Sequence, residues 1–270
     1  MSDSQPHEQG ISLQDQALGE MLQGMRDGKH DIKVNGEPVE VIRPLGAGGT
    51  KKVFDVALGG NRVALALPND VDGVIRMKQK WENIMHEPEN TNRVRALGIP
   101  TNTVCETVPI TLNGVPFDAL RLTRYEDLPF QVLDGKNRLS TEYAGSVLPE
   151  QLDSESFQAL FGGIVTDTAT LISNGVHLGR DSFNVCVVDN GLRLFLNDLG
   201  SARFEPFEPG EIDHVSQQYT ISTLDAFVNG LNEEEYQRHK GFLDGKAFEF
   251  NNPDKMSVIL ARAVRQKVTE

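Results

Sequence analysis

Apolar and polar residues alternate along much of the first half of the chain, which predicts strands joined by tight turns. The predicted hairpin turns are Asn35-Gly36, Gly59-Gly60-Asn61 and Asn113-Gly114. Asparagine and glycine favour these positions because two-residue turns need positive φ angles. Between the second and third hairpins, residues 71–97 follow a helical period, with a break expected at Pro88. The first 125 residues therefore predict a mostly antiparallel sheet with one helical insertion.

Helical periodicity is clearest in the second half of the chain. Apolar residues recur on one face from Ser154 to Asn174, which predicts one long helix with Asp153 as its N-cap. A hairpin is predicted from strands at 185–188 and 192–196, and a further helix around 221–231. Residues 128–152 show no regular period, so we expect irregular structure there.

The N-terminal 31 residues are expected to form a polar tail followed by a short amphipathic helix. The helix is predicted from residue 13 to about 25, where apolar side chains recur on one face, and Gly28 is expected to end it. Residues 1–10 contain neither a basic segment nor an apolar stretch, so no Sec-type leader is expected. Secretion by a machine that reads a disordered N-terminus stays open.

Composition narrows the classes of function. The 270 residues carry 39 acidic and 26 basic side chains, a net charge of −13, which argues against general nucleic-acid binding and against docking on anionic lipid. No apolar run reaches the length that spans a membrane. Cys105 and Cys186 are too few and too far apart for a disulfide framework, so we expect two buried thiols. A reducing, aqueous compartment such as the cytoplasm is expected.

A glycine-rich segment, Gly46-Ala47-Gly48-Gly49-Thr50-Lys51-Lys52-Val53, lies between two predicted strands. Glycine lets backbone N–H groups approach phosphate oxygens closely. Because no helix follows, this segment is neither a dinucleotide-binding fingerprint nor a P-loop. Taken alone, it is a weak signal, because a glycine-rich hairpin is more often only a turn.

A second group of polar residues surrounds the predicted hairpin of the second half. His177 to Asn184 form the loop before it, and Asp198-Leu199-Gly200 come directly after it. Strand pairing should bring the amide of Asn184 close to the carboxylate of Asp198. Oxygen atoms of these two groups, with phosphate oxygens and water, are ligands that Mg²⁺ prefers. The alternative is that both residues only cap or turn the chain.

The order of these motifs, from about residue 38 to 200, resembles that of the protein-kinase superfamily. Gly46, Gly48 and Val53 match its glycine loop G-x-G-x-x-G-x-V. The resemblance implies that this loop, including Gly49 and Lys51, holds ATP.

The second half of the resemblance concerns metal and catalysis. His177 and Asn184 match the ends of H-x-D-x-x-x-x-N, and Asp198 opens the counterpart of D-F-G. The resemblance implies that Asn184 and Asp198 hold Mg²⁺ on ATP. His177 is expected to brace the loop rather than to act as a base.

Two departures from the family pattern affect the expected chemistry. The lysine of V-A-x-K is replaced by Ala66, and Lys51 stands where the with-no-lysine kinases place a substitute. We expect Lys51 to supply the missing charge, with Glu87 as its partner and Glu82 as the alternative.

The catalytic aspartate of H-x-D is the second departure, since Gly179 occupies its position. Asp181, two residues further on, could act as the base if the loop is remodelled. Otherwise the site holds nucleotide without fast chemistry.

The resemblance implies an α+β, two-lobed kinase-like fold with a reduced C-lobe. The expected parts are a tail and short helix (1–31), an N-lobe (32–124) and a helical C-lobe (125–270). Residues 201–213 contain no A-P-E motif, so neither activation by phosphorylation of a long loop nor a standard peptide-docking platform is expected. The compact C-lobe is similar to that of some bacterial kinase-like proteins, including effectors delivered into host cells.

The expected function is transfer of a phosphoryl group from ATP–Mg²⁺ to a protein hydroxyl. The alternatives are a pseudokinase that binds nucleotide or a protein partner, and a kinase-fold enzyme with other chemistry such as AMP transfer.

Overall fold

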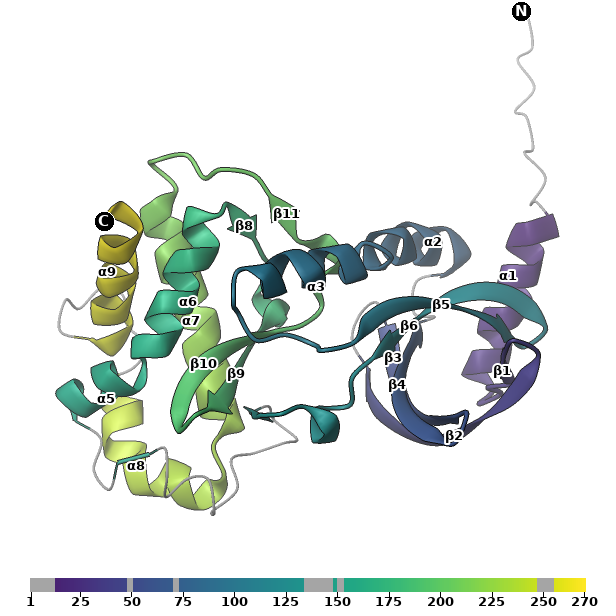
Figure 1. Ribbon diagram of the computed structural model, residues 1–270, viewed down its shortest axis with the longest axis horizontal. Coiled ribbons are helices and arrows are strands. Elements are labelled where there is room, and N and C mark those ends of the chain that lie inside the picture. Colours follow the sequence, from purple (N-terminus) through teal and green to yellow (C-terminus); the bar gives the residue numbers. More distant parts are fainter. Residues whose placement is uncertain (1–12, 48–50, 70–72, 134–147, 150–152, 247–254) are drawn as a thin grey trace, which may run out of the picture. The chain divides into compact units, whose positions relative to one another are not determined.

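The structure is a computed structural model that describes residues 13–47, 51–69, 73–133, 148–149, 153–246 and 255–270 (Figure 1). The chain forms two compact units. The first contains the described residues up to Met85 together with Val104–Arg124, and the second contains His86–Thr103 and Tyr125–Glu270. The helix expected within 1–31 belongs to the first unit, and residues 86–103, expected in the N-lobe, belong to the second. The expected tail at 1–12 lies outside the described residues.

The first unit is a barrel of six antiparallel strands. They are β1 (Ile32–Val34), β2 (Glu37–Ala47), β3 (Lys51–Leu58), β4 (Asn61–Pro68), β5 (Cys105–Leu112) and β6 (Val115–Leu122). The three predicted hairpins are confirmed, but the expected sheet is a closed barrel in the order β1-β2-β3-β4-β6-β5 (Figure 1). Closure comes from pairing of Ile32 in β1 with Leu112 in β5. Local sequence patterns carry no information about that long-range pairing.

Four hairpin turns among the described residues use positive φ angles at both of their central residues. The residues are Asn35 (52°), Gly36 (84°), Gly59 (58°), Gly60 (82°), Asn113 (50°), Gly114 (84°), Asp189 (49°) and Asn190 (61°). Turns of this hand match the twist of the strands they join, which is why the turn signals located the hairpins correctly.

Two helices accompany the barrel, α1 (Leu13–Arg26) and α2 (Gly73–Ile84). Apolar side chains of both helices join the hydrophobic core of the first unit. Trp81 of α2 also donates from Nε1 to the carbonyl oxygen of Asp118 at 2.8 Å. The predicted break is confirmed, since α2 ends at Ile84 and Pro88 lies in the first turn of α3 (Glu87–Ala96).

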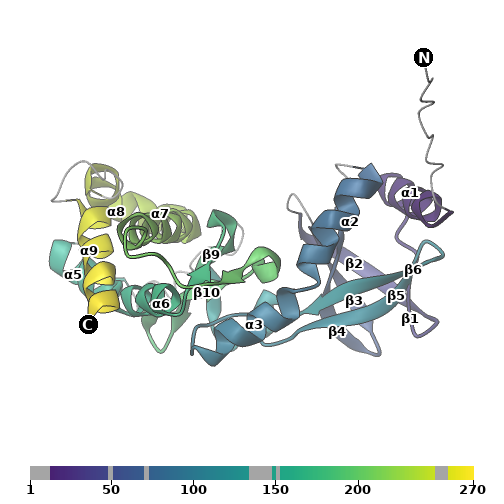
Figure 2. The same ribbon diagram turned by 90° about the horizontal axis from the view of Figure 1, so that it is seen from above.

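The second unit combines helices with short strands. Besides α3, its helices are α5 (Ser154–Leu160), α6 (Gly162–Ser173), α7 (Ile212–Gly230), α8 (Glu233–Lys246) and α9 (Met256–Thr269). Its strands are β7 (Gln131–Leu133), β8 (Val176–His177), β9 (Phe183–Val188), β10 (Gly191–Leu196) and β11 (Arg203–Phe204). They form a sheet in the order β10-β9-β7 and a separate β11-β8 pair. Figure 2 shows α9 beside α6 and α7, with which it packs.

The single long helix expected from Ser154 to Asn174 is wrong, because the chain forms α5 and α6 with a turn at Phe161. The two glycines that follow weaken a continuous helix. Gly163 is also needed for packing, since a Cβ atom there would lie 2.5 Å from the carbonyl oxygen of Leu192. The expected cap is confirmed: the Asp153 carboxylate accepts from the Ser156 N–H at 2.8 Å.

Smaller differences concern the strands of the second unit. The segment expected to be irregular contains β7, which pairs through Gln131–Leu133 with β9. Strand β9 begins at Phe183, before the predicted start at residue 185. A three-residue strand is too short to give a recognisable alternation, so its neighbour in the sheet decides its conformation.

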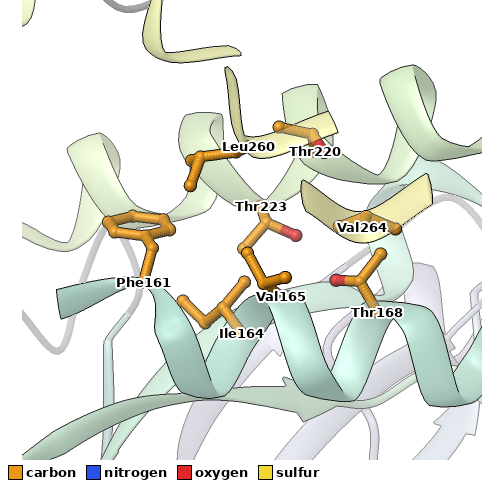
Figure 3. Close-up of a pocket in the computed structure, with 8 residues that line it drawn as sticks. All are labelled: Phe161, Ile164, Val165, Thr168, Thr220, Thr223, Leu260 and Val264. Atoms are coloured by element: carbon orange, nitrogen blue, oxygen red, sulfur yellow. The ribbon is translucent and has the colours of Figure 1, made fainter. Parts of the chain in front are cut away.

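The described helices of the second unit pack closely. A cavity of about 10 Å³ lies among α6, α7 and α9, lined by Phe161, Ile164, Val165, Thr168, Thr220, Thr223, Leu260 and Val264 (Figure 3). This volume is at the lower limit for a single water molecule, so the cavity is a packing defect and not a ligand site. Among the described residues no helix is both long and apolar enough to cross a bilayer.

A buried ion pair connects α6 to the hairpin β9–β10. Arg193 donates from Nη2 and Nε to the two carboxylate oxygens of Asp167, each at 2.7 Å, and the Leu194 N–H donates to the same carboxylate at 3.0 Å. Arg193 also donates to the carbonyl oxygen of Gly98 at 2.9 Å. Burial, the largest influence, raises the pKa of Asp167 above its ordinary value although Arg193 opposes the rise.

Candidate functional site

The loop that precedes β9 is held by α7 and by the segment after β11. Tyr219 of α7 donates from its hydroxyl to the carbonyl oxygen of Val176 at 2.7 Å and accepts from the Leu178 N–H at 2.9 Å. His177 hydrogen-bonds through Nε2 with the carbonyl oxygen of Glu205 at 2.9 Å, and its ring contacts Phe207 at 3.9 Å between ring centroids with a tilt of 34°. The expectation that His177 braces the loop is therefore confirmed.

Ser182 joins this loop to the segment that contains Asp198. Its hydroxyl donates to the carbonyl oxygen of Asp198 at 3.3 Å, and its own carbonyl oxygen accepts from the Asn197 N–H at 3.1 Å. Strand pairing of Phe183 with Leu196 continues the connection. The loop and the segment after the hairpin are thus fixed to each other at the open end of β9 and β10.

The position of Asp181 relates directly to the absent side chain at Gly179. A Cβ atom built on Gly179 would lie 2.7 Å from the Oδ1 atom of Asp181. The turn between them is a 3₁₀ turn, in which the Ser182 N–H donates to the carbonyl oxygen of Gly179 at 3.2 Å. The exposed carboxylate of Asp181 therefore occupies the space that a side chain on residue 179 would fill. Neighbouring Arg180 pairs instead with Asp225 of α7 at 3.0 Å.

Asn184 lies at the open end of the hairpin, beside the residue that precedes Asp198. Its Nδ2 donates to Oδ1 of Asn197 at 3.0 Å. Asp198 itself adopts the left-handed conformation, with φ of 53° and ψ of 49°, an uncommon conformation for a residue other than glycine. This backbone geometry is typical of functional positions and tight turns.

Helix α3 supports the turn that follows Asp198. Asn90 donates from Nδ2 to the carbonyl oxygen of Leu199 at 2.8 Å, and Leu199 is fully buried. Glu87 opens the same helix with its side chain buried, whereas Glu82 on α2 is exposed. Of the two glutamates considered from the sequence, Glu87 is therefore the one whose side chain is shielded from solvent.

The lysines of the glycine-rich segment differ in burial. Lys51 is 9% exposed at the start of β3, whereas Lys52 is half-buried. Alternation along a strand places Lys51 and Val53 on one face and Lys52 on the other. Val53 pairs with Gly46 of β2 and with Ala66 of β4, so Lys51 shares its face with the position where the expected lysine is missing.

Asp55 lies on the same face of β3 as Lys51 and Val53, and three arginine side chains lie near its carboxylate. Its fully buried carboxylate accepts from Nε of Arg62 at 3.2 Å and from Nε of Arg43 at 3.3 Å, and Nη1 of Arg124 lies 3.8 Å away. Burial acts to raise the pKa of Asp55, but these arginines outweigh it and hold the pKa below its ordinary value. The carboxylate is therefore ionised and balanced by positive charge.

The structure brings together part of the set predicted from the sequence. Asp181, Asn184 and Asp198 belong to segments that flank the open end of one hairpin in the second unit, where Ser182 bonds to the Asp198 carbonyl and Asn184 bonds to Asn197. Gly46, Lys51 and Val53 lie together on β2 and β3 of the first unit. Gly48 and Gly49 lie outside the described residues.

The residues that hold this arrangement in place are not among the predicted site residues. Tyr219 and Asn90 act over long sequence separations and belong to no motif, so no local signal identifies them. Ser182 and Asn197 stand inside or beside the matched motifs, and their polar side chains were the available signal.

No protein-family model matches the chain, and no curated protein is similar to it at a significant level. Among solved structures, the chain is similar to variant forms of the kinase domain of PknI from Mycobacterium tuberculosis. Two of them have sequence identities of 14% and 16% and TM-scores of 0.39 and 0.37, and each match covers 85% of this chain and 95% of the other.

Proposed function

We propose that the protein binds ATP with Mg²⁺ and transfers a phosphoryl group to the hydroxyl group of a protein substrate. Asp181 is the proposed general base, Asn184 and Asp198 are the proposed metal ligands, and Lys51 is the proposed phosphate-binding cation. Glu87 is the proposed partner of Lys51. Gly46, Gly48, Gly49 and Val53 complete the proposed nucleotide site.

The proposal depends mainly on the position of the Asp181 carboxylate beside Gly179. In the family that the sequence resembles, the base comes from the position that Gly179 occupies. Asp181 reaches the space beside Gly179 from two residues further along the chain, with Oδ1 2.7 Å from a Cβ built there. A carboxylate can serve as base from any backbone position, provided that it lies within hydrogen-bond reach of the attacking hydroxyl.

The chemistry of the donor set fits Mg²⁺ but does not complete its coordination. Among the described residues, no group of three or more histidine, cysteine, aspartate or glutamate side chains is placed to hold a metal ion. Asn184 and Asp198 supply amide and carboxylate oxygens, which Mg²⁺ accepts together with phosphate oxygens and water. When bound, the ion would neutralise charge on the transferred phosphoryl group.

The test is a transfer assay with ATP labelled at the γ-phosphate, using generic protein substrates and the protein itself. We expect Asp181→Asn to lower turnover by about 10²–10⁴-fold with little change in ATP affinity. Asp189→Asn is the matched control, because Asp189 lies in the exposed turn of the same hairpin and asparagine accepts its φ of 49°. Equal activity of the Asp181→Asn variant and the parent would exclude Asp181 as the base.

A second candidate is a nucleotide-binding module without catalysis, favoured by the absence of a side chain at Gly179. It predicts ATP–Mg²⁺ binding in calorimetry with no labelled product from either the γ- or the α-labelled nucleotide. Label transferred only from the α-position would instead indicate AMP transfer. Absence of nucleotide binding would overturn both candidates.

A further inference from the structure

Three polar side chains of the second unit form a continuous chain of hydrogen bonds. Asn184 donates from Nδ2 to Oδ1 of Asn197 at 3.0 Å, and Asn197 donates from Nδ2 to the hydroxyl oxygen of Tyr125 at 2.8 Å. Tyr125 lies far from the other two in sequence. Its ring stands edge-on to Phe195, with 5.5 Å between ring centroids and an interplanar angle of 84°.

The donor-to-acceptor direction of these hydrogen bonds determines which end of the Asn184 amide is available to a ligand. An asparagine amide has a donor end and an acceptor end. With Nδ2 directed to Asn197, the carbonyl oxygen Oδ1 is the end that can meet a cation. If the Tyr125 hydroxyl donated to Asn197 instead, both amides would reverse, and Asn184 would present its NH₂ group, which repels a cation.

We propose that Tyr125 and Asn197 are positioning residues, which hold the Asn184 amide with its oxygen toward Mg²⁺. The inference rests on the proposed metal role of Asn184, and it adds two residues that belong to none of the matched motifs. A bound cation in turn favours the direction in which the Tyr125 oxygen accepts. Metal binding at the hairpin and the hydrogen bonding of Tyr125 are therefore coupled.

Substitutions can separate this role from simple packing. Tyr125→Phe removes the hydroxyl group and keeps the ring that contacts Phe195. The Asn197 N–H, which donates to the carbonyl oxygen of Ser182 at 3.1 Å, belongs to the backbone and is retained in every variant at that position. Asn197→Asp also preserves the hydrogen bonds that link the three side chains, because a carboxylate accepts both from Asn184 Nδ2 and from the Tyr125 hydroxyl.

The experiment is calorimetric titration of the full chain with ATP, with and without Mg²⁺. For Tyr125→Phe and Asn197→Ala we expect the gain in ATP affinity produced by Mg²⁺ to fall about three- to tenfold, the effect of one lost hydrogen bond. ATP affinity without Mg²⁺ should change by less than about twofold. Asn197→Asp should retain the gain, and Tyr236→Phe on α8 is the matched tyrosine control. Thermal unfolding checks that each variant is folded.

The outcomes separate this inference from the proposed function. If the parent shows the Mg²⁺-dependent gain and Tyr125→Phe retains it, the positioning role is wrong and the metal site stands. Equal loss of affinity with and without Mg²⁺ would also overturn it, because that result indicates a general structural effect. If the parent shows no Mg²⁺-dependent gain, both the metal site and the positioning role fail.

Discussion

Replacement of Arg193 by glutamine tests the buried ion pair that joins α6 to the hairpin of the proposed site. The substitution removes two hydrogen bonds of 2.7 Å from Asp167, whose side chain is 4% exposed. Breaking a buried pair by removing one partner costs about 3–5 kcal/mol, because the remaining charge is buried without compensation. Arg193 is itself 33% exposed, so we expect the lower end, about 3 kcal/mol near neutral pH.

The loss should depend on pH, and its sign follows from the raised pKa of Asp167. A carboxyl group with a raised folded-state pKa binds its proton more tightly in the native state. Ionisation therefore lowers stability as the pH rises from the unfolded-state pKa of about 4 to the folded-state pKa. Without Arg193 the folded-state pKa rises further, and protonation relieves the buried charge at low pH. The deficit of the variant should be larger at about pH 8 than at about pH 5.

The assay is urea unfolding of parent and variant at both pH values. Arg265→Gln is the matched control, since its partner Asp213 lies 2.8 Å away and both side chains are more than half exposed. We expect it to cost under about 1 kcal/mol, as exposed pairs do. The reasoning is refuted if Arg193→Gln costs no more than Arg265→Gln, or if its deficit is the same at both pH values. Adding Asp167→Asn should recover part of the loss, because the two residues are coupled.

Asp55→Asn should lower the free energy of unfolding by about 3 kcal/mol at neutral pH, because three arginines lose their shared anion. Since the pKa of Asp55 is lowered, its contribution is present above about pH 4 and is lost as the pH falls further, so denaturant unfolding should show the deficit shrinking in acid. Lys51→Ala should weaken ATP–Mg²⁺ binding by about 1.5–3 kcal/mol in calorimetry and Lys52→Ala by much less; equal losses would exclude a specific role for Lys51. Leu260→Ala, beside the cavity of Figure 3, should cost about 2–5 kcal/mol in urea unfolding, whereas Ile42→Ala, at 42% exposure, should cost little.

The sequence alone was sufficient for features that depend on neighbouring residues. Asparagine–glycine and glycine–glycine pairs adopt positive φ angles at little cost, so the turns at Asn35, Gly59 and Asn113 located three hairpins. Proline cannot continue a helix, so Pro88 marked the boundary between α2 and α3. Alternation along β3 likewise places Lys51 and Lys52 on opposite faces, and the two differ in burial.

Tertiary structure decided every feature that depends on distant residues. Pairing of Ile32 with Leu112 closed the barrel, and close contact with Leu192 requires a glycine at position 163, in the first turn of α6. The orientation of Asn184 depends on Tyr125, whose hydroxyl meets Asn197 only after the chain has folded. A sequence pattern reports the preferences of adjacent residues, whereas these contacts are selected by the packing of the folded chain as a whole. The types of residue available for the proposed chemistry were therefore visible in the sequence, and their relative positions were not.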